Sequence, residues 1–221
     1  MRCGPVSEVW IVPGLAVRRY AVPAADALRA HGHRVKLLDP PGWPGRPPEL
    51  DRYGHRVADE IVRASSRIDL LIGLSVGGQA AAVVAADHPG VSRLLLVSPT
   101  IGPVQRSRHA LLTGWLRGED HPNSPATRTH LPDWRRAGPA RIYRTFTSVL
   151  RIRLEDVLPH VDAAVTIAHA DHDRLSTHGY AAELAQLCRA RFLVLPNAPH
   201  SWPVGDDAGF IALVDELLAA D

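Results

Sequence analysis

The sequence predicts an α/β protein in which a mainly parallel sheet of about six strands lies between two layers of helices. Short apolar runs alternate with longer helical patterns, as expected for parallel strands joined by helical crossovers. The third apolar run leads directly into Gly73-Leu74-Ser75-Val76-Gly77, which places a serine where a strand turns into a helix. At 221 residues the chain has the length of one sizeable domain of this class, so we expect a single domain over 1–221.

Each expected strand is a short apolar run that ends where Gly, Pro or Asp breaks the pattern. These runs lie at 8–12, 34–39, 69–74, 92–98, 163–168 and 191–196. Helical patterns fill the intervals at 22–31, 51–65, 76–87, 177–189 and 206–219. Gly32 favours the end of the first helix, because glycine accepts the left-handed backbone that commonly follows a helix.

One interval, from Thr100 to about Leu158, contains no strand pattern. Within it, 108–116 and 140–149 favour helices, joined by a Pro- and His-containing stretch from 118 to 132. Long insertions in compact domains are often functional, so we predict a helical lid at about 102–156, inserted after the fourth strand.

The charge is nearly neutral overall, at +2, but it is unevenly distributed. Ten arginines and three acidic residues between Gly102 and Arg153 leave that segment at +7 and the remainder at −5. The simplest interpretation is solvated arginines on exposed helices. Alternatively, some of them, such as Arg135 and Arg136, attract an anionic substrate or the acidic surface of a coenzyme A or acyl-carrier-protein thioester.

Composition also limits the partners and the location. Nothing in the charge pattern indicates nucleic-acid binding, and no apolar run approaches the ~18 residues that span a bilayer. The first residues become polar before a secretory signal can develop, so we expect a cytoplasmic protein that does not bind membranes. The sequence is compatible with a monomer or a homodimer.

The serine corner has the spacing of a nucleophile elbow. Such a corner forces its serine into a cramped backbone conformation, which requires small residues two positions before and after, and Gly73 and Gly77 meet this need. A Gly-x-Ser-x-Gly match alone is weak evidence, but here a strand precedes it and a helix follows. The hydroxyl of Ser75 would then lie beside the first amides of the next helix, which can stabilise an oxyanion.

A serine nucleophile needs a general base and an orienting carboxylate. Asp171 and Asp173 follow the fifth strand, and His200 follows the sixth. All of these residues, like Ser75, come at carboxyl ends of strands, where parallel sheets collect their reactive groups.

On these segments the chain resembles the α/β-hydrolase fold superfamily nearly end to end, as a small lidded member of serine esterase or thioesterase type. Residues 11–15 resemble the family's first strand and oxyanion loop, and 38–45 resemble its Asp-x-Pro-Gly-x-Gly turn. The elbow and Pro199-His200 complete the resemblance. It implies a catalytic triad of Ser75, Asp173 and His200, with the backbone amides of Leu15 and Val76 as the oxyanion hole.

The chain departs from the family pattern in three places. Pro13-Gly14 stands where the family often has His-Gly, and the acid loop reads Ala170-Asp171-His172-Asp173 in place of Gly-x-x-Asp. We favour Asp173 as the acid, with Asp171 as the alternative. We also expect the sheet to lack the N-terminal strand pair of larger members, since only a few residues precede the first strand.

The resemblance implies hydrolysis of a carboxylic ester, thioester or lactone, with a small acyl molecule as substrate and no cofactor. We expect no metal, because His169 and His172 lack a metal-ligand spacing. Gly14 and Trp202 are expected near the substrate, although Trp202 could instead pack under the last helix. Two other functions remain open: a lyase or cyclase reaction on the same triad, and ligand binding without turnover.

Overall fold

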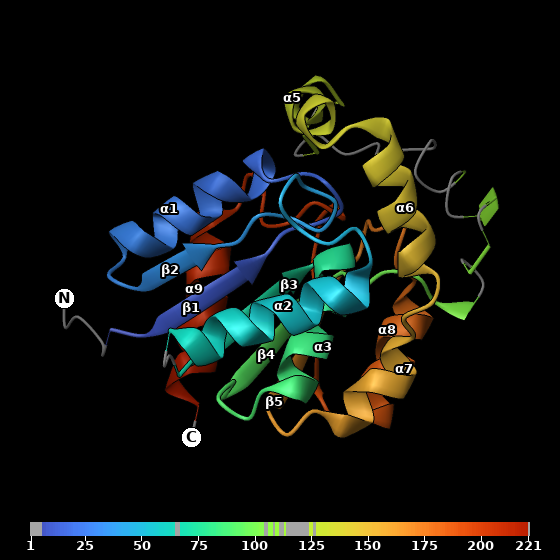
Figure 1. Cartoon of the computed structure of the whole chain (residues 1–221). Coiled ribbons are helices and arrows are strands. Elements are labelled where there is room, and N and C mark those ends of the chain that lie inside the picture. Colours follow the sequence, from blue (N-terminus) through green and yellow to red (C-terminus); the bar gives the residue numbers. More distant parts are fainter. Residues whose placement is uncertain are drawn as a thin grey trace.

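The computed structural model describes residues 6–64, 67–103, 106–107, 109–110, 113, 124–125 and 127–220. Within these residues, six parallel strands form one sheet in the order β2-β1-β3-β4-β5-β6. The strands are β1 (Glu8–Val12), β2 (Arg34–Leu37), β3 (Leu70–Leu74), β4 (Arg93–Val97), β5 (Ala164–Ala170) and β6 (Arg191–Leu195). The predicted three-layer α/β architecture is confirmed (Figure 1).

Helices cover both faces of this sheet. The helices that connect the strands are α1 (Val22–Ala30), α2 (Leu50–Arg63), α3 (Val76–Asp87) and α8 (His178–Leu187), and α9 (Asp207–Ala219) follows the last strand. Between β4 and β5, the described residues form the further helices α5 (Thr127–Ala137), α6 (Pro139–Val149) and α7 (Leu154–Val157). Single 3-10 turns occur at η1 (Arg19–Ala21) and η3 (Leu158–His160). None of the described helices is long and apolar enough to cross a membrane.

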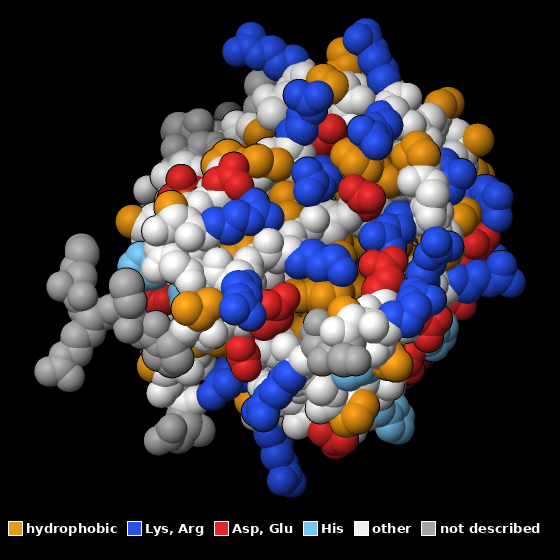
Figure 2. Space-filling model, turned by 60° about the vertical axis from the view of Figure 1, so that its left-hand side comes forward, with side chains coloured by type: hydrophobic (Ala, Val, Ile, Leu, Met, Phe, Trp, Pro, Cys, Tyr) orange, Lys and Arg blue, Asp and Glu red, His pale blue; other side chains and the backbone are white. Residues whose placement is uncertain are grey.

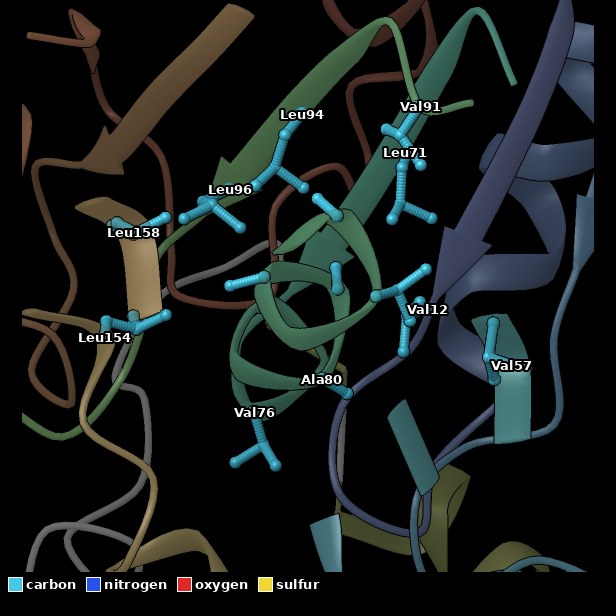
Figure 3. Close-up of a cluster of buried hydrophobic side chains, with 14 of the residues drawn as sticks. Val12, Val57, Leu71, Val76, Ala80, Val91, Leu94, Leu96, Leu154 and Leu158 are labelled. Atoms are coloured by element: carbon cyan, nitrogen blue, oxygen red, sulfur yellow. The ribbon is translucent and has the colours of Figure 1, made fainter. Parts of the chain in front are cut away.

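The two faces of the sheet build two separate parts of the core, because successive side chains of a strand point to opposite faces. Val9 and Ile11 of β1 pack with α1 and α9, whereas Trp10 and Val12 pack with α2, α3 and α8. Figure 3 shows the second part, in which Leu71, Leu94 and Leu96 of the sheet lie along one side of α3. Both faces are therefore covered, which explains why the strands are near-continuous apolar runs.

Most element boundaries match the sequence prediction within two residues, but one correction is needed. The stretch 118–132 was expected to join two helices, yet α5 begins at Thr127 and continues through Pro132. Of the helix expected at 108–116, most residues lie outside the part of the chain that the structure describes. The lid over the site stays a prediction, and the described part of that interval contains helices α5, α6 and α7.

The order of the strands places a switch point between β1 and β3. The chain passes from β1 outward to β2 and then returns to add β3 on the other side of β1. Ligands of open parallel sheets bind at such a point, beyond the carboxyl ends of the strands. The loops that follow β1 and β3 carry Gly14 and Ser75, so these two residues meet at this position.

Candidate active site

Ser75 occupies a strained corner between β3 and α3. Its backbone has φ 54° and ψ −124°, in the region that L-residues rarely adopt. A Cβ added at Gly77 would lie 2.2 Å from the carbonyl oxygen of Val12, and one at Gly73 would lie 2.5 Å from the Cα of Gly78. Only glycine fits at either position, so the cramped corner predicted from the sequence is present.

The structure brings Ser75, His200 and Asp173 into one hydrogen-bonded chain. Nε2 of His200 lies 2.7 Å from Oγ of Ser75, and Nδ1 lies 2.7 Å from Oδ2 of Asp173. Since a carboxylate only accepts hydrogen bonds, Nδ1 carries the proton and Nε2 accepts from the serine hydroxyl. This is the tautomer in which the imidazole can receive the proton of Ser75.

Asp173 is enclosed and held on both carboxylate oxygens. Its side chain is 0% exposed, and Oδ1 accepts from the amides of Leu175 (2.7 Å) and Ser176 (2.8 Å). Burial works against its ionisation, but the charge and hydrogen bond of His200, with the two amides, outweigh burial and lower the pKa of Asp173 below its usual value. The carboxylate is therefore ionised at neutral pH.

Asp171, the alternative acid, lies elsewhere and makes different contacts. It is exposed, and its two oxygens accept from the amides of Asn197 (2.9 Å) and Ala198 (3.0 Å) in the loop that leads to His200. Desolvation opposes its charge, yet these amides hold the pKa of Asp171 below its usual value. The geometry thus places Asp173, and not Asp171, against the imidazole, while Asp171 clamps the backbone of the next loop.

The two amides expected to bind an oxyanion belong to residues near the serine. A Cβ added at Gly14 would lie 3.7 Å from Cβ of Ser75, so the loop after β1 passes directly beside the nucleophile candidate. Val76 begins α3, whose N-terminus carries partial positive charge. Within the described residues, the amides of Leu15 and Val76 donate to no protein acceptor. Both donors are thus available to a bound group.

A family model described as "Alpha/beta hydrolase family" matches residues 4–213. The chain belongs to the α/β hydrolase family. The comparison with curated proteins finds no match.

Solved structures with the same fold support this assignment. The chain is similar to a hydrolase from Pseudomonas aeruginosa PA01, with TM-score 0.77, 20% identity, and coverage of 97% of this chain and 91% of that one. It is also similar to the enol-lactonase from Burkholderia xenovorans LB400, with TM-score 0.74, 18% identity and coverage of 100% and 94%. An enzyme that degrades N-acyl homoserine lactones gives TM-score 0.77 at 16% identity, with coverage of 96% and 93%.

Trp202 of the hydrolase lies in the core. Its ring meets that of Phe210 in α9 edge to face, with centroids 5.4 Å apart, and its Nε1 donates to Asp206 (2.9 Å). Of the two positions considered from the sequence, near the substrate or under the last helix, the structure shows the second.

The two arginines expected near the substrate end helix α5 and are exposed. The guanidinium of Arg136 stacks on the ring of Trp43, 4.5 Å from its centroid, in the loop after β2. Arg135 forms no ion pair with any described residue.

Several side chains that support the site were not identified from the sequence. The hydroxyl of Tyr20 accepts from the amide of Gly14 (2.9 Å), and the amide of Gln79 donates to the carbonyls of Val149 (3.2 Å) and Ile152 (2.8 Å) in the insertion. Asp133 of α5 accepts from the backbone at the start of η1. These contacts join residues far apart in the chain, so no local sequence motif predicts them.

The described residues contain no group of three or more His, Cys, Asp or Glu side chains that could hold a metal ion. His169, at the end of β5, is buried, and this burial lowers its pKa. Its ring lies 5.4 Å from that of His178, edge to face, which is a packing contact.

Proposed function

We propose that this α/β hydrolase is a serine hydrolase that cleaves a carboxylic ester, thioester or lactone through an acyl-enzyme on Ser75. The observation that carries the proposal is the continuous chain of hydrogen bonds from Ser75 through His200 to Asp173, with 2.7 Å at each link. A structural role alone does not require a strained serine at the end of such a chain.

The proposed reaction uses the groups as they lie. His200 takes the proton of Ser75 as Oγ attacks the carbonyl carbon, and Asp173 stabilises the resulting imidazolium. The amides of Leu15 and Val76 bind the oxyanion. The protonated His200 gives its proton to the departing alcohol or thiol, which leaves an ester on Ser75. Water, deprotonated by His200, then attacks this ester and releases the acid.

The names of two similar structures support the range of substrates. One is an enol-lactonase and the other degrades N-acyl homoserine lactones. Both names refer to cyclic esters, whose cleavage is the same acyl transfer to water. At below 20% identity these proteins do not identify the acyl group.

The proposal is tested by labelling the intact protein and its Ser75→Ala variant with a fluorophosphonate probe, read by mass spectrometry. Hydrolysis of acyl p-nitrophenyl esters is followed in parallel. We expect one probe per chain on Ser75, no labelling of the variant, and ester hydrolysis that the variant loses. A folded protein that reacts with neither probe nor ester would overturn the proposal and favour ligand binding without turnover. Labelling without hydrolysis of any ester, thioester or lactone would favour a lyase or cyclase reaction.

We further infer that a thioester on coenzyme A or on an acidic carrier protein is the substrate within this class. Support comes from the exposed arginines of α5 and from the positive charge of the 102–153 segment. Figure 2 shows one face of the molecule, on which basic side chains are numerous but interspersed with acidic ones. Attraction by Arg135 and Arg136 should weaken with salt.

Arg135→Ala is the cleaner variant for this test, because Arg136 also packs on Trp43. If the inference holds, kcat/KM for an acyl-coenzyme A falls several-fold in Arg135→Ala and at high salt, whereas kcat/KM for a neutral p-nitrophenyl ester does not change. Equal values for the thioester under all conditions would refute the carrier idea and leave the hydrolase proposal intact.

A further inference from the structure

The loop beside Ser75 is held in place by Tyr20. The amide of Gly14 donates to the buried Tyr20 hydroxyl (2.9 Å), and the carbonyl of Gly14 faces the amide of Val17 (3.5 Å). In a trans peptide the N–H points opposite to the preceding C=O, so the amide of Leu15 points away from Val17. Glycine otherwise rotates easily. The contacts of Gly14 therefore set the direction of the Leu15 amide, the candidate oxyanion donor.

Tyr20 in turn depends on helix α5 of the insertion. Its side chain is 8% exposed, and its ring meets that of His130 edge to face, with centroids 6.0 Å apart. His130 packs against Trp134 one turn later, at 5.5 Å. Helix α5 thus packs against the ring of Tyr20.

The same helix also holds the turn that carries Tyr20. Oδ2 of Asp133 accepts from the amides of Arg18 (2.7 Å) and Arg19 (2.9 Å), and the guanidinium of Arg19 approaches Oδ1 at 3.2 Å. The residue before η1, Arg18, provides no side-chain cap of its own. Asp133, which is 3% exposed and lies 115 residues after Arg18 in the chain, therefore acts as an N-cap for η1.

A third contact reaches the other end of the loop. Ala16 has a strained φ of 54° and packs with Trp43 and Ala137 of α5, and Leu15 lies against this cluster. Helix α5 thus contacts the loop after β1 at three places: through His130, through Asp133 and through Ala137.

We propose that Tyr20 and Asp133 are positioning residues for the oxyanion hole, so that seating of α5 determines whether the Leu15 amide faces the reacting carbonyl. The inference rests on the serine hydrolase function proposed above. It assigns to the insertion a role in forming the hole, in addition to the lid role expected from the sequence. It also identifies what replaces the His of the family's His-Gly pair, since the loop here is held by a tyrosine hydroxyl from the next turn.

The decisive variant is Tyr20→Phe, which removes the hydroxyl and keeps the ring against His130. We expect kcat to fall about 10- to 100-fold with little change in KM, because the donor contacts the oxyanion only after attack. The inhibition constant of an alkyl boronic acid, which forms a tetrahedral adduct on serine, should rise by a similar factor. Tyr143→Phe, an exposed tyrosine on α6, is the matched control and should behave as the wild type.

Asp133 is tested by a pair of variants. Asp133→Ala should lower kcat as Tyr20→Phe does, whereas Asp133→Asn, which keeps a carbonyl oxygen for the two amides, should restore most of the activity. If Asp133→Ala fails to fold, the kcat values of Tyr20→Phe and Asp133→Asn still decide whether the positioning role holds.

The outcomes separate this inference from the function on which it rests. A wild type that no fluorophosphonate labels would overturn both. A labelled wild type whose Tyr20→Phe variant keeps its kcat and its boronic acid affinity would overturn the positioning role alone. An equal loss of kcat and of thermal stability in all variants, including Tyr143→Phe, would likewise show a general structural effect and refute it.

Discussion

Replacing Asp173 by Asn should inactivate the hydrolase without unfolding it, because the two ends of the new amide face incompatible partners. Oδ1 of Asp173 accepts from the amides of Leu175 and Ser176, and Oδ2 faces Nδ1 of His200. Asn has one accepting oxygen and, in place of the second oxygen, an NH2 group that can only donate. Keeping the carbonyl on the two amides turns the NH2 group toward His200, whose Nδ1 must then accept. Nε2 would carry the proton and could not receive another from Ser75.

The size of the effect follows from these bonds. Turning the amide the other way sacrifices two hydrogen bonds of about 1 to 1.5 kcal/mol each, so the productive tautomer is disfavoured by about 2–3 kcal/mol, or roughly 30- to 150-fold. The lost charge beside the imidazolium costs about 1.5–3 kcal/mol more. Together we expect kcat to fall by about 10³–10⁴, within the range seen when a triad acid becomes an amide.

The assay is the pseudo-first-order rate of fluorophosphonate labelling, with ester kcat measured on the same samples. Asp171→Asn is the matched control two residues away. It keeps one of two loop contacts, with Asn197 or Ala198, so we expect only a several-fold loss. Activity of Asp173→Asn within tenfold of the wild type, or an equal loss in Asp171→Asn, would refute the assignment of Asp173 as the acid.

Three further predictions concern stability. Gly77→Ala should destabilise the protein by about 3 kcal/mol in urea titration, because its Cβ meets the Val12 carbonyl oxygen at 2.2 Å; an unchanged midpoint would contradict this. Thr145→Val should raise the free energy of unfolding by about 1 kcal/mol, since the buried Thr145 hydroxyl has no partner among the described residues; Thr147→Val, which breaks a bond to a carbonyl, should not. Because the pKa of Asp173 is lowered in the folded state, its contribution to stability is present above the ordinary pKa of about 3.9 and is lost as pH falls below it. The free energy of unfolding, measured by denaturation between about pH 2 and 6, should therefore fall less with acid in Asp173→Asn than in the wild type. Identical slopes of this free energy against pH would contradict the lowered pKa.

The fold could be predicted because its strands are buried on both faces and its nucleophile corner has strict local requirements. An apolar run such as 70–74 and two glycines around a serine are local features, which a sequence displays directly. Boundaries were less well predicted where tertiary contacts decide them. Strand β2 ends at Leu37, before the Pro40-Pro41 pair, although apolar character continues to Leu38.

The choice between the two aspartates shows what local pattern cannot decide. Asp171 and Asp173 lie in one short loop after β5, and the sequence places both within reach of a histidine after β6. The loop turns Asp173 inward to the amides of Leu175 and Ser176, and leaves Asp171 at the surface against the β6 loop. Position along the chain therefore predicts which loops meet, but the path of the backbone within each loop decides which side chain faces His200.

The sequence was least informative about the structure of the insertion, and the contacts that hold the insertion explain why. Helix α5 contains Pro132 and many polar residues, so neither propensity nor apolar periodicity predicts where it begins. Its anchoring contacts come instead from single side chains such as Asp133, whose partners are backbone amides 114 and 115 residues away. In a segment noticed for its arginines, the buried side chain that accepts from the backbone of the η1 turn is therefore an acidic one. Charge counts report the solvent-facing surface of such a helix, whereas its relation to the oxyanion loop depends on the few polar groups that face inward.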